Sequence, residues 1–267
     1  MTRQKLIELI RTRRTYLCVG LDTDITKIPR HLLSEPDPVF AFNKQIIDVT
    51  KDYCVGYKVN TAFYEALGLA GWEALEKTAD YIPSTHFKIA DAKRGDIGNT
   101  SAQYAKAFFD TLNFDAVTVA PYMGEDSIRP FLEYKNKWAI VLGLTSNEGA
   151  GDFELSSTID NEFLYEKVIR KVSTWGNPEN LMFVIGATKS NWFTQIRKIA
   201  PEHFYLVPGL GAQGGSLQEI STKAMNKDVG IIVNASRTII YASDKEDFAA
   251  KAAAAARQYQ TEMSSFL

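Results

Sequence analysis

The chain has 267 residues, of which 45% are hydrophobic and 23% are charged. This length permits one large domain with a substantial core, or two small ones. A net charge of −2 and a pI near 6.0 provide no overall field to attract nucleic acid or an anionic membrane, so neither is expected as a partner. The apolar runs are strand-sized, and residues 1–17 lack the apolar core of a secretion signal.

Short apolar runs alternate with amphipathic stretches from one end of the chain to the other. The expected strands are residues 16–22, 55–60, 86–93, 116–122, 138–146, 181–187, 203–209 and 230–235. The expected helices are residues 38–52, 71–81, 101–112, 126–134, 161–175, 191–200 and the alanine-rich 245–263.

Eight strand–helix units in a chain of this length favour a (β/α)8 TIM barrel, which typically has about 250 residues. A doubly wound open sheet is the main alternative that the pattern leaves open. No linker, charge block or low-complexity tract divides the chain, so residues 1–267 are expected to form a single domain. In a barrel, functional residues lie where the strands end and the βα loops begin.

The third expected strand ends in the run KIADAKRGDIGNT, residues 88–100. Side chains alternate along a strand, so Asp91 and Lys93 are expected to share one face and to point into the barrel at its rim. Asp96 follows just beyond the strand and is free to turn toward the same place. A solvated loop with incidental charges is the alternative interpretation.

The two preceding strands bring further charges to the same rim. Lys58 lies near the end of the second strand, and Asp22 ends the first. An ion in a partly dry pocket persists only if it is paired. The alternation of two carboxylates with the ammonium groups of Lys58 and Lys93 therefore predicts a mutually paired array.

A glycine-rich segment follows the seventh strand. Residues 209–214 spell GxGxxG, but they follow a late strand, and Asn234 stands where a dinucleotide site would have an acid. In barrels, the loops after strands seven and eight often bind phosphate. Exposed backbone N–H groups, a helix starting from Ser216 and the Arg237 guanidinium would serve that purpose. We therefore expect a bound phosphate, with a mere tight turn as the alternative.

Ser146 ends the fifth strand and precedes a long, polar and glycine-rich loop. Loops of this length are usually lids or disordered segments. The Ser146 hydroxyl is suited to reading the polar edge of a ring, although a helix cap or turn explains it equally well.

The residue sets that usually carry metal or nucleophile chemistry are missing. His31, His86 and His203 are scattered without partners at metal-ligand spacing, and no Cys–His or Ser–His–Asp set lines the rim. Cys18 and Cys54 lie in apolar runs without a CxxC spacing, which favours buried free thiols and a reducing, cytoplasmic setting. The residues point to chemistry by Lys and Asp on a small phosphorylated substrate, with no metal and no cofactor.

The chain resembles the orotidine 5′-phosphate decarboxylase family over nearly its whole length, and most of all its longer bacterial branch. The matching segments are VGLD at 19–22, YK at 57–58, DAKRGDIGNT at 91–100, TSN at 145–147, PGLGAQGG at 208–215 and SR at 236–237. DxKxxD is shared with sugar-phosphate relatives, whereas the longer run together with PGxGAQGG is highly specific. Ser236 departs from the glycine that many members have before the arginine.

The resemblance implies cofactor-free decarboxylation of orotidine 5′-phosphate to UMP and CO2, the last step of de novo UMP biosynthesis. Lys93 would protonate C6 of the pyrimidine as CO2 leaves. Asp91 would lie against the substrate carboxylate, with Asp96 and Lys58 completing the charged array. The other implied contacts are Asp22, Lys58 and Thr100 with the ribose hydroxyls, Ser146 with the pyrimidine edge, and Gln213, Ser236 and Arg237 with the phosphate. The resemblance also implies a homodimer in which Asp96 and Thr100 cross into the site of the other subunit.

Three other functions remain open at this point. A sugar-phosphate decarboxylase or aldolase of the same superfamily would keep the fold but use Mg²⁺ and an enediolate. The lack of a further acid beside Asp22 and Asp91 speaks modestly against it. A Schiff-base aldolase would use Lys58 or Lys93 as its nucleophile. A non-catalytic sensor of nucleotide phosphates would have little reason to retain both lysines and all three aspartates.

Overall fold

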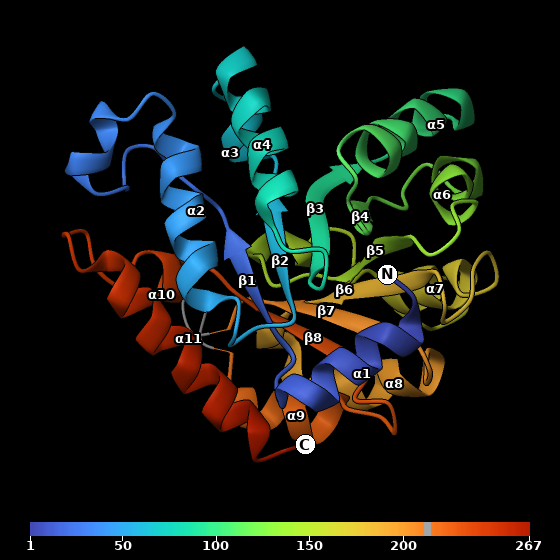
Figure 1. The fold of residues 1–267 in the computed structure, drawn as a ribbon. Coiled ribbons are helices and arrows are strands. Elements are labelled where there is room, and N and C mark those ends of the chain that lie inside the picture. Colours follow the sequence, from blue (N-terminus) through green and yellow to red (C-terminus); the bar gives the residue numbers. More distant parts are fainter. Residues whose placement is uncertain (211–214) are drawn as a thin grey trace.

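The computed structural model describes residues 1–210 and 215–267. Eight parallel strands pair in chain order and close into a barrel, with helices packed around it (Figure 1). The expected (β/α)8 architecture is confirmed, and the open doubly wound sheet is wrong because β1 pairs with β8 as well as with β2.

Each observed strand overlaps one of the expected strands. The bounds are β1 Leu17–Leu21, β2 Gly56–Asn60, β3 Phe87–Arg94, β4 Ala116–Val119, β5 Trp138–Leu144, β6 Leu181–Ile185, β7 Phe204–Pro208 and β8 Ile231–Ala235. The largest difference is in β4, which was expected to reach residue 122 but ends at Val119. Pro121 follows, and proline has no N–H group to donate to a neighbouring strand.

The helices pack outside the strands. The bounds are α1 Arg3–Arg13, α2 Pro38–Thr50, α3 Ala62–Glu65, α4 Leu69–Tyr81, α5 Gly98–Lys106, α6 Glu125–Leu132, α7 Leu164–Val172, α8 Phe193–Ile199, α9 Leu217–Ala224, α10 Arg237–Ile240 and α11 Phe248–Ser264. A π-helical turn, Ala107–Thr111, continues α5, and 3-10 helices occupy Arg30–Ser34, Glu148–Gly151 and Ala187–Trp192. The short helices α3 and α10 and the first helix, α1, were not expected from the sequence.

The helix α1 lies at the amino ends of the strands (Figure 1). Its buried residues include Leu6 and Ile10. The Met1 carbonyl, just before the helix, accepts a hydrogen bond of 2.8 Å from the indole of Trp138, the first residue of β5. The amino end of the barrel is therefore closed by apolar packing, which leaves the carboxyl end as the place for a site.

Burial along the strands changes toward the carboxyl end of the barrel. All residues of β1, β6 and β8 are buried, as expected for parallel strands covered on both faces. The strand β3 is buried from Phe87 to Ala90, but its residues from Asp91 onward are partly or fully accessible. The charged run that ends β3 therefore emerges from the core at the carboxyl rim.

Candidate active site

The structure joins the four rim charges in one chain of ion pairs. Lys58 Nζ lies 3.4 Å from a carboxylate oxygen of Asp22 and 2.7 Å from one of Asp91. The other oxygen of Asp91 lies 2.6 Å from Lys93 Nζ. Strand register explains why these side chains lie close together. Gly20 of β1 lies opposite Lys58 of β2, and Asn60 of β2 lies opposite Asp91 of β3.

Burial and charge act in opposite directions on the middle of this chain of ion pairs. Burial alone would raise the pKa of Asp91, but the ammonium groups of Lys58 and Lys93 lower it well below its usual range. Burial alone would lower the pKa of Lys58, but Asp22 and Asp91 raise it above its usual value. Lys58 is only 3% exposed, whereas the Lys93 side chain is 50% exposed. Asp91 and Lys58 therefore stay charged at neutral pH, and Lys93 remains accessible.

The alternation expected along β3 does not extend to Lys93. This residue has φ of 48°, in the left-handed region, and the pairing of β3 with β4 shifts register between Ala90 and Arg94. Its N–H donates to the Thr118 hydroxyl at 2.9 Å, and that hydroxyl donates to Asp91 at 3.0 Å. A bulge of this kind re-aims a side chain. Thr118 was not predicted from the sequence, although it is the one polar residue of β4.

A cavity of about 150 Å³ lies beside the ion pairs. Its lining residues come from the first three strands and from the last two: Asp22, Lys58, Asn60, Asp91, Pro208, Gly209, Leu210, Asn234, Ser236 and Arg237. Asp22, Lys58 and Asp91 thus share one space with two of the three predicted phosphate ligands, whereas Lys93 is not among the lining residues. Asn60 and Asn234 were not predicted. The buried amide oxygen of Asn234 has no hydrogen-bond partner among the described residues.

The end of the site where phosphate is expected combines a glycine of positive φ with a helix start. Gly209 has φ of 100°, which other residues rarely adopt. The helix expected from Ser216 is confirmed as α9, and the Ser216 hydroxyl caps it by accepting the Glu219 N–H at 3.3 Å. Gln213 lies outside the described residues. The Ser236 hydroxyl donates to the Gly20 carbonyl at 3.1 Å, so this departure from glycine ties β8 to β1.

Ser146 lies two residues beyond the end of β5, which stops at Leu144 and not at residue 146 as expected. Its hydroxyl is buried and has no hydrogen-bond partner in the part of the chain that the structure describes. A Cβ atom at position 186 would lie 2.1 Å from this oxygen, so Gly186, just after β6, makes room for it. Leaving such a group unpaired costs about 1–3 kcal/mol. A ligand that bonded this hydroxyl would remove that cost. Ser146 is not among the residues that line the 150 Å³ cavity.

Asp96 and Thr100 lie outside the chain of ion pairs within one copy of the protein. The Asp96 carboxylate accepts the Ile97 N–H at 2.7 Å, and Thr100 occupies the first turn of α5. Within residues 1–210 and 215–267, no ion pair involves Asp96. The roles that the resemblance implies for these two residues involve a second copy of the chain.

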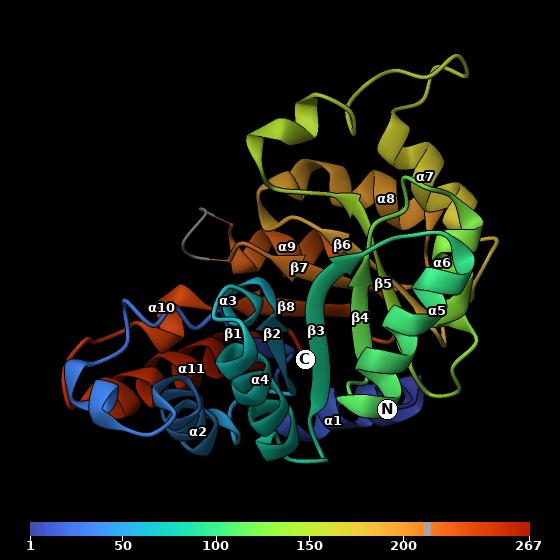
Figure 2. The ribbon, with the colours of Figure 1, turned by 90° about the horizontal axis from the view of Figure 1, so that it is seen from above.

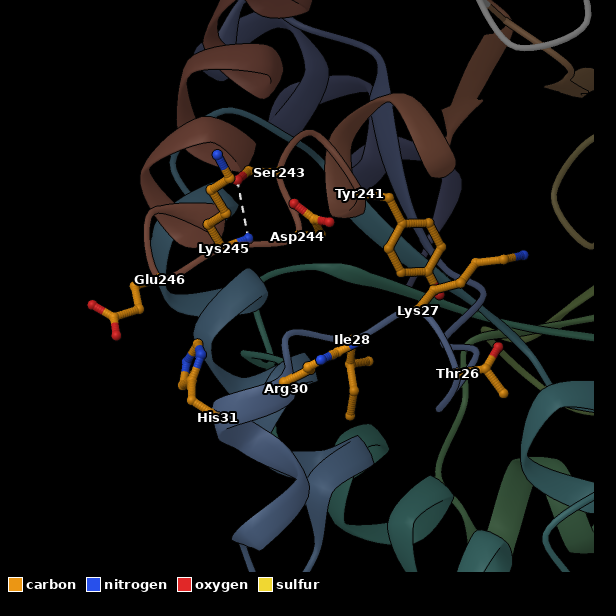
Figure 3. Close-up of a pocket in the computed structure, with 10 residues that line it drawn as sticks. All are labelled: Thr26, Lys27, Ile28, Arg30, His31, Tyr241, Ser243, Asp244, Lys245 and Glu246. Carbon is orange, nitrogen blue, oxygen red and sulfur yellow. Dashed lines mark hydrogen bonds between the residues drawn. The ribbon is translucent and has the colours of Figure 1, made fainter.

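A larger cavity, of about 820 Å³, lies beside the site, and Figure 3 shows its lining. It is formed by residues 26–31 after β1 and by residues 241–246 between α10 and α11, so it includes none of the predicted site residues. Tyr241 links the two spaces. Its ring lines this cavity, while its hydroxyl donates to the Asp22 carbonyl at 3.0 Å and accepts the Asp24 N–H at 2.7 Å. Tyr241 thus holds the backbone that carries Asp22.

Some expectations concern features other than this site. Among the described residues, no group of three His, Cys, Asp or Glu side chains is placed to hold a metal ion. None of the described helices combines the length and the apolar character needed to cross a membrane. Cys18 and Cys54 are free and buried, as predicted.

The closed barrel, with a charged site at the carboxyl ends of its strands, places the chain in the class of TIM-barrel proteins whose ligand meets the βα loops. A sequence model described as "Orotidine 5'-phosphate decarboxylase / HUMPS family" matches residues 15–252. The chain belongs to this family, which confirms the resemblance found in its motifs.

Relatives match the chain from end to end. The orotidine 5′-phosphate decarboxylase of Christiangramia forsetii is 59% identical over 270 residues, which cover 100% of this chain and 99% of the relative. That of Bacteroides fragilis is 58% identical over 266 residues, with 98% and 97% covered. The solved structure of Leishmania donovani OMP decarboxylase superposes with a TM-score of 0.85 at 34% identity, covering 100% of this chain and 98% of that one.

Proposed function

We propose that the protein converts orotidine 5′-phosphate to UMP and CO2, the last step of de novo UMP biosynthesis, without a cofactor. The observation that carries this proposal is the run of ion pairs from Asp22 through Lys58 and Asp91 to Lys93, which borders a cavity shared with Arg237. Full-length relatives named for this activity support it.

Lys93 is the proposed proton donor. When the bond from C6 to the carboxylate carbon breaks, CO2 leaves and the electron pair stays on C6 in an orbital that the ring cannot delocalise. C6 then takes a proton from the Lys93 ammonium, which leaves a neutral amine for solvent to reprotonate. Because Asp91 holds this ammonium at 2.6 Å before the reaction, its field is preorganised for the developing charge.

The other proposed roles are those that the family resemblance implies, and Asp22, Lys58, Asp91, Ser236 and Arg237 line the cavity. Asp91 lies against the departing carboxylate, and Lys58 and Asp22 bind ribose hydroxyls. Ser146 reads the pyrimidine edge. The proposed phosphate ligands are Gln213, Ser236 and Arg237. Binding of the phosphate, remote from C6, supplies energy to close the loops and exclude water.

The test is an absorbance assay of orotidine 5′-phosphate consumption in EDTA. We expect full turnover. Turnover that disappears in EDTA and returns with Mg²⁺ would instead support the sugar-phosphate enzyme. Covalent trapping by borohydride in the presence of substrate would support the Schiff-base aldolase. UMP binding without any turnover would support the sensor.

We further propose a two-fold homodimer in which Asp96 and Thr100 complete the site of the other subunit. Asp96 lies beyond the end of β3 and away from the ion pairs of its own chain. The adjoining loops expose apolar side chains: Ile97 is 54% exposed, Met123 49% and Tyr122 91%. A second copy would cover them, and a two-fold axis would make the exchange reciprocal.

Co-refolding two inactive variants tests the shared site. Lys93→Ala and Asp96→Asn subunits pair at random, so about half the dimers are mixed. In each mixed dimer, one site has both defects and the other has neither. Roughly a quarter of wild-type activity should therefore return. If activity stays at the sum of the two variants, Asp96 serves its own chain.

We also propose that residues 1–267 form one domain and that the protein works in the cytoplasm. The last helix, α11, packs against α2, α10 and β1. The end of the chain therefore packs on its first strand and helices, within the same domain. Two buried free thiols suit a reducing compartment.

A further inference from the structure

One carboxylate anchors the loop between β5 and α7 to the end of β5. Glu154 Oε2 accepts the Thr145 N–H at 2.7 Å, and Glu154 Oε1 lies 2.8 Å from the Thr145 hydroxyl oxygen. Thr145 is the residue immediately before Ser146. We propose that Glu154 is a positioning residue that holds Ser146 where it reads the pyrimidine. This inference rests on the proposed function, in which Ser146 has that role.

The backbone around Glu154 is itself fixed. Its carbonyl accepts the Tyr165 N–H at 3.0 Å, and the Ser156 carbonyl accepts the Leu164 N–H at 2.9 Å. Both donors belong to the first turn of α7. Figure 2 shows the loop leaving β5, projecting from the barrel and returning to α7. Glu154 therefore joins two rigid elements. Its backbone carbonyl is hydrogen-bonded to α7, and its side chain is hydrogen-bonded to Thr145 at the end of β5.

Proton counting defines which substitutions keep this link. The Thr145 hydroxyl oxygen lies 2.8 Å from Glu154 Oε1 and 2.6 Å from the side-chain oxygen of Asn147. One hydroxyl has one proton, so both contacts are satisfied if the Asn147 amide is turned to donate to Thr145, which then donates to Glu154. A glutamine at 154 would also serve. Its oxygen would accept the Thr145 N–H, and its nitrogen would donate to the hydroxyl. An alanine would remove both bonds.

The consequence falls on the Ser146 hydroxyl. Gly186 lies against it on one side and donates its N–H to the Leu144 carbonyl at 2.8 Å. Glu154 restrains Thr145 on the other side. Between these restraints the buried hydroxyl has no partner among the described residues. Without the Glu154 link, Ser146 can move so that its hydroxyl bonds another group. It then no longer contacts the pyrimidine of the substrate.

Kinetics of matched variants test the inference. Wild-type turnover is measured first. Glu154→Ala should raise the KM for orotidine 5′-phosphate about tenfold or more, since it removes two hydrogen bonds of a charged group. Glu154→Gln should restore a nearly wild-type KM. The control is Glu148→Ala, an exposed acid of the same loop, which should change nothing. In a Ser146→Ala background, Glu154→Ala should have little further effect, because both substitutions remove one interaction.

Three outcomes would overturn the inference: an unchanged KM in Glu154→Ala, no rescue by glutamine, or an undiminished effect in the Ser146→Ala background. If Glu154→Ala does not fold, Thr145→Val is tested for the same coupling at smaller magnitude, since it removes the hydroxyl contacts with Glu154 and Asn147 but keeps the N–H bond to Glu154. If the wild type shows no turnover, the proposed function fails. Hydrogen exchange at the Thr145 amide then still tests the link, since exchange should accelerate in Glu154→Ala and not in Glu148→Ala.

Discussion

The two sides of the cavity differ in how far their polar groups are already satisfied. On the side of β1, β2 and β3, Lys58 is paired with Asp22 and Asp91, and Asp91 also with Lys93. On the side of β7 and β8, the buried amide oxygen of Asn234 has no partner among the described residues, and neither has the hydroxyl oxygen of Ser146, which lies outside the cavity lining. The first side is thus already paired in the structure, and under the proposed function we expect the substrate to supply partners on the second. Substitutions on the first side should act on chemistry and stability, and those on the second on binding.

The largest effect is expected for Lys93→Ala, which should lower kcat by many powers of ten. One ammonium both donates the proton and offsets the charge at C6, and such an interaction acts mainly in the transition state. The fold should survive because this side chain is half exposed. Turnover and calorimetric UMP binding are the measurements. UMP affinity should change far less than kcat. Near-wild-type turnover would show that Lys93 is not the proton donor.

On the other side of the cavity, Arg237→Ala should raise KM about tenfold to a hundredfold and lower kcat less. A guanidinium binds two phosphate oxygens through charge-assisted bonds. Binding of uridine, which has no phosphate, should not change. Arg30→Ala removes another exposed arginine and serves as the control. If KM is unchanged, the phosphate lies elsewhere.

The assembled side should also contribute to stability. Lys58→Met should lower the free energy of unfolding at pH 7 by about 3–5 kcal/mol, because it removes one partner of a buried ion pair. Urea unfolding of the wild type and the variant measures this difference. The matched control is Lys77→Met, which removes a lysine paired with Asp37 at the surface and should cost about 1 kcal/mol or less.

The pH dependence of that difference follows from the direction of the two pKa shifts. The Asp91 pKa is lowered on folding, so its contribution is complete above the unfolded pKa of about 3.9 and is lost as pH falls through the folded pKa. The Lys58 pKa is raised, so its contribution is complete below about 10.4 and is lost as pH rises through the folded pKa. Between wild type and Lys58→Met, the difference in unfolding free energy should shrink as pH falls below about 4. A constant difference would contradict this account of Asp91.

The smallest effect is expected where the site meets the larger cavity. Tyr241→Phe removes the hydroxyl that bridges the Asp22 carbonyl and the Asp24 N–H. It should cost about 1 kcal/mol of stability and raise KM severalfold without changing kcat. Tyr81→Phe, which removes a hydroxyl bonded to Asp48 far from the site, is the control. An effect confined to kcat would mean that Tyr241 acts on the chemistry and not on the placement of Asp22.

Most of the architecture could be predicted because its signal is local. Apolar runs of strand length alternating with amphipathic segments predict eight strand–helix units, and the geometry of parallel strands requires their ends to share a rim. That is why Asp22, Lys58, Asp91 and Lys93 could be expected to converge. The helix α1 escaped prediction because its apolar residues are few among many charges. Burial of these residues at the amino end of the barrel stabilises it, together with the N-cap at Thr2.

The details of the site were decided by contacts between residues far apart in the chain. The left-handed turn at Lys93 depends on Thr118 of the next strand, and the place of Ser146 depends on Gly186 and on the returning Glu154. Sequence by itself determined which residue types reach the rim, because strand periodicity and chain order are properties of short segments. Only the tertiary structure decided which atoms pair there and which remain open for a ligand, because register, bulges and the return path of a loop are set when the barrel closes.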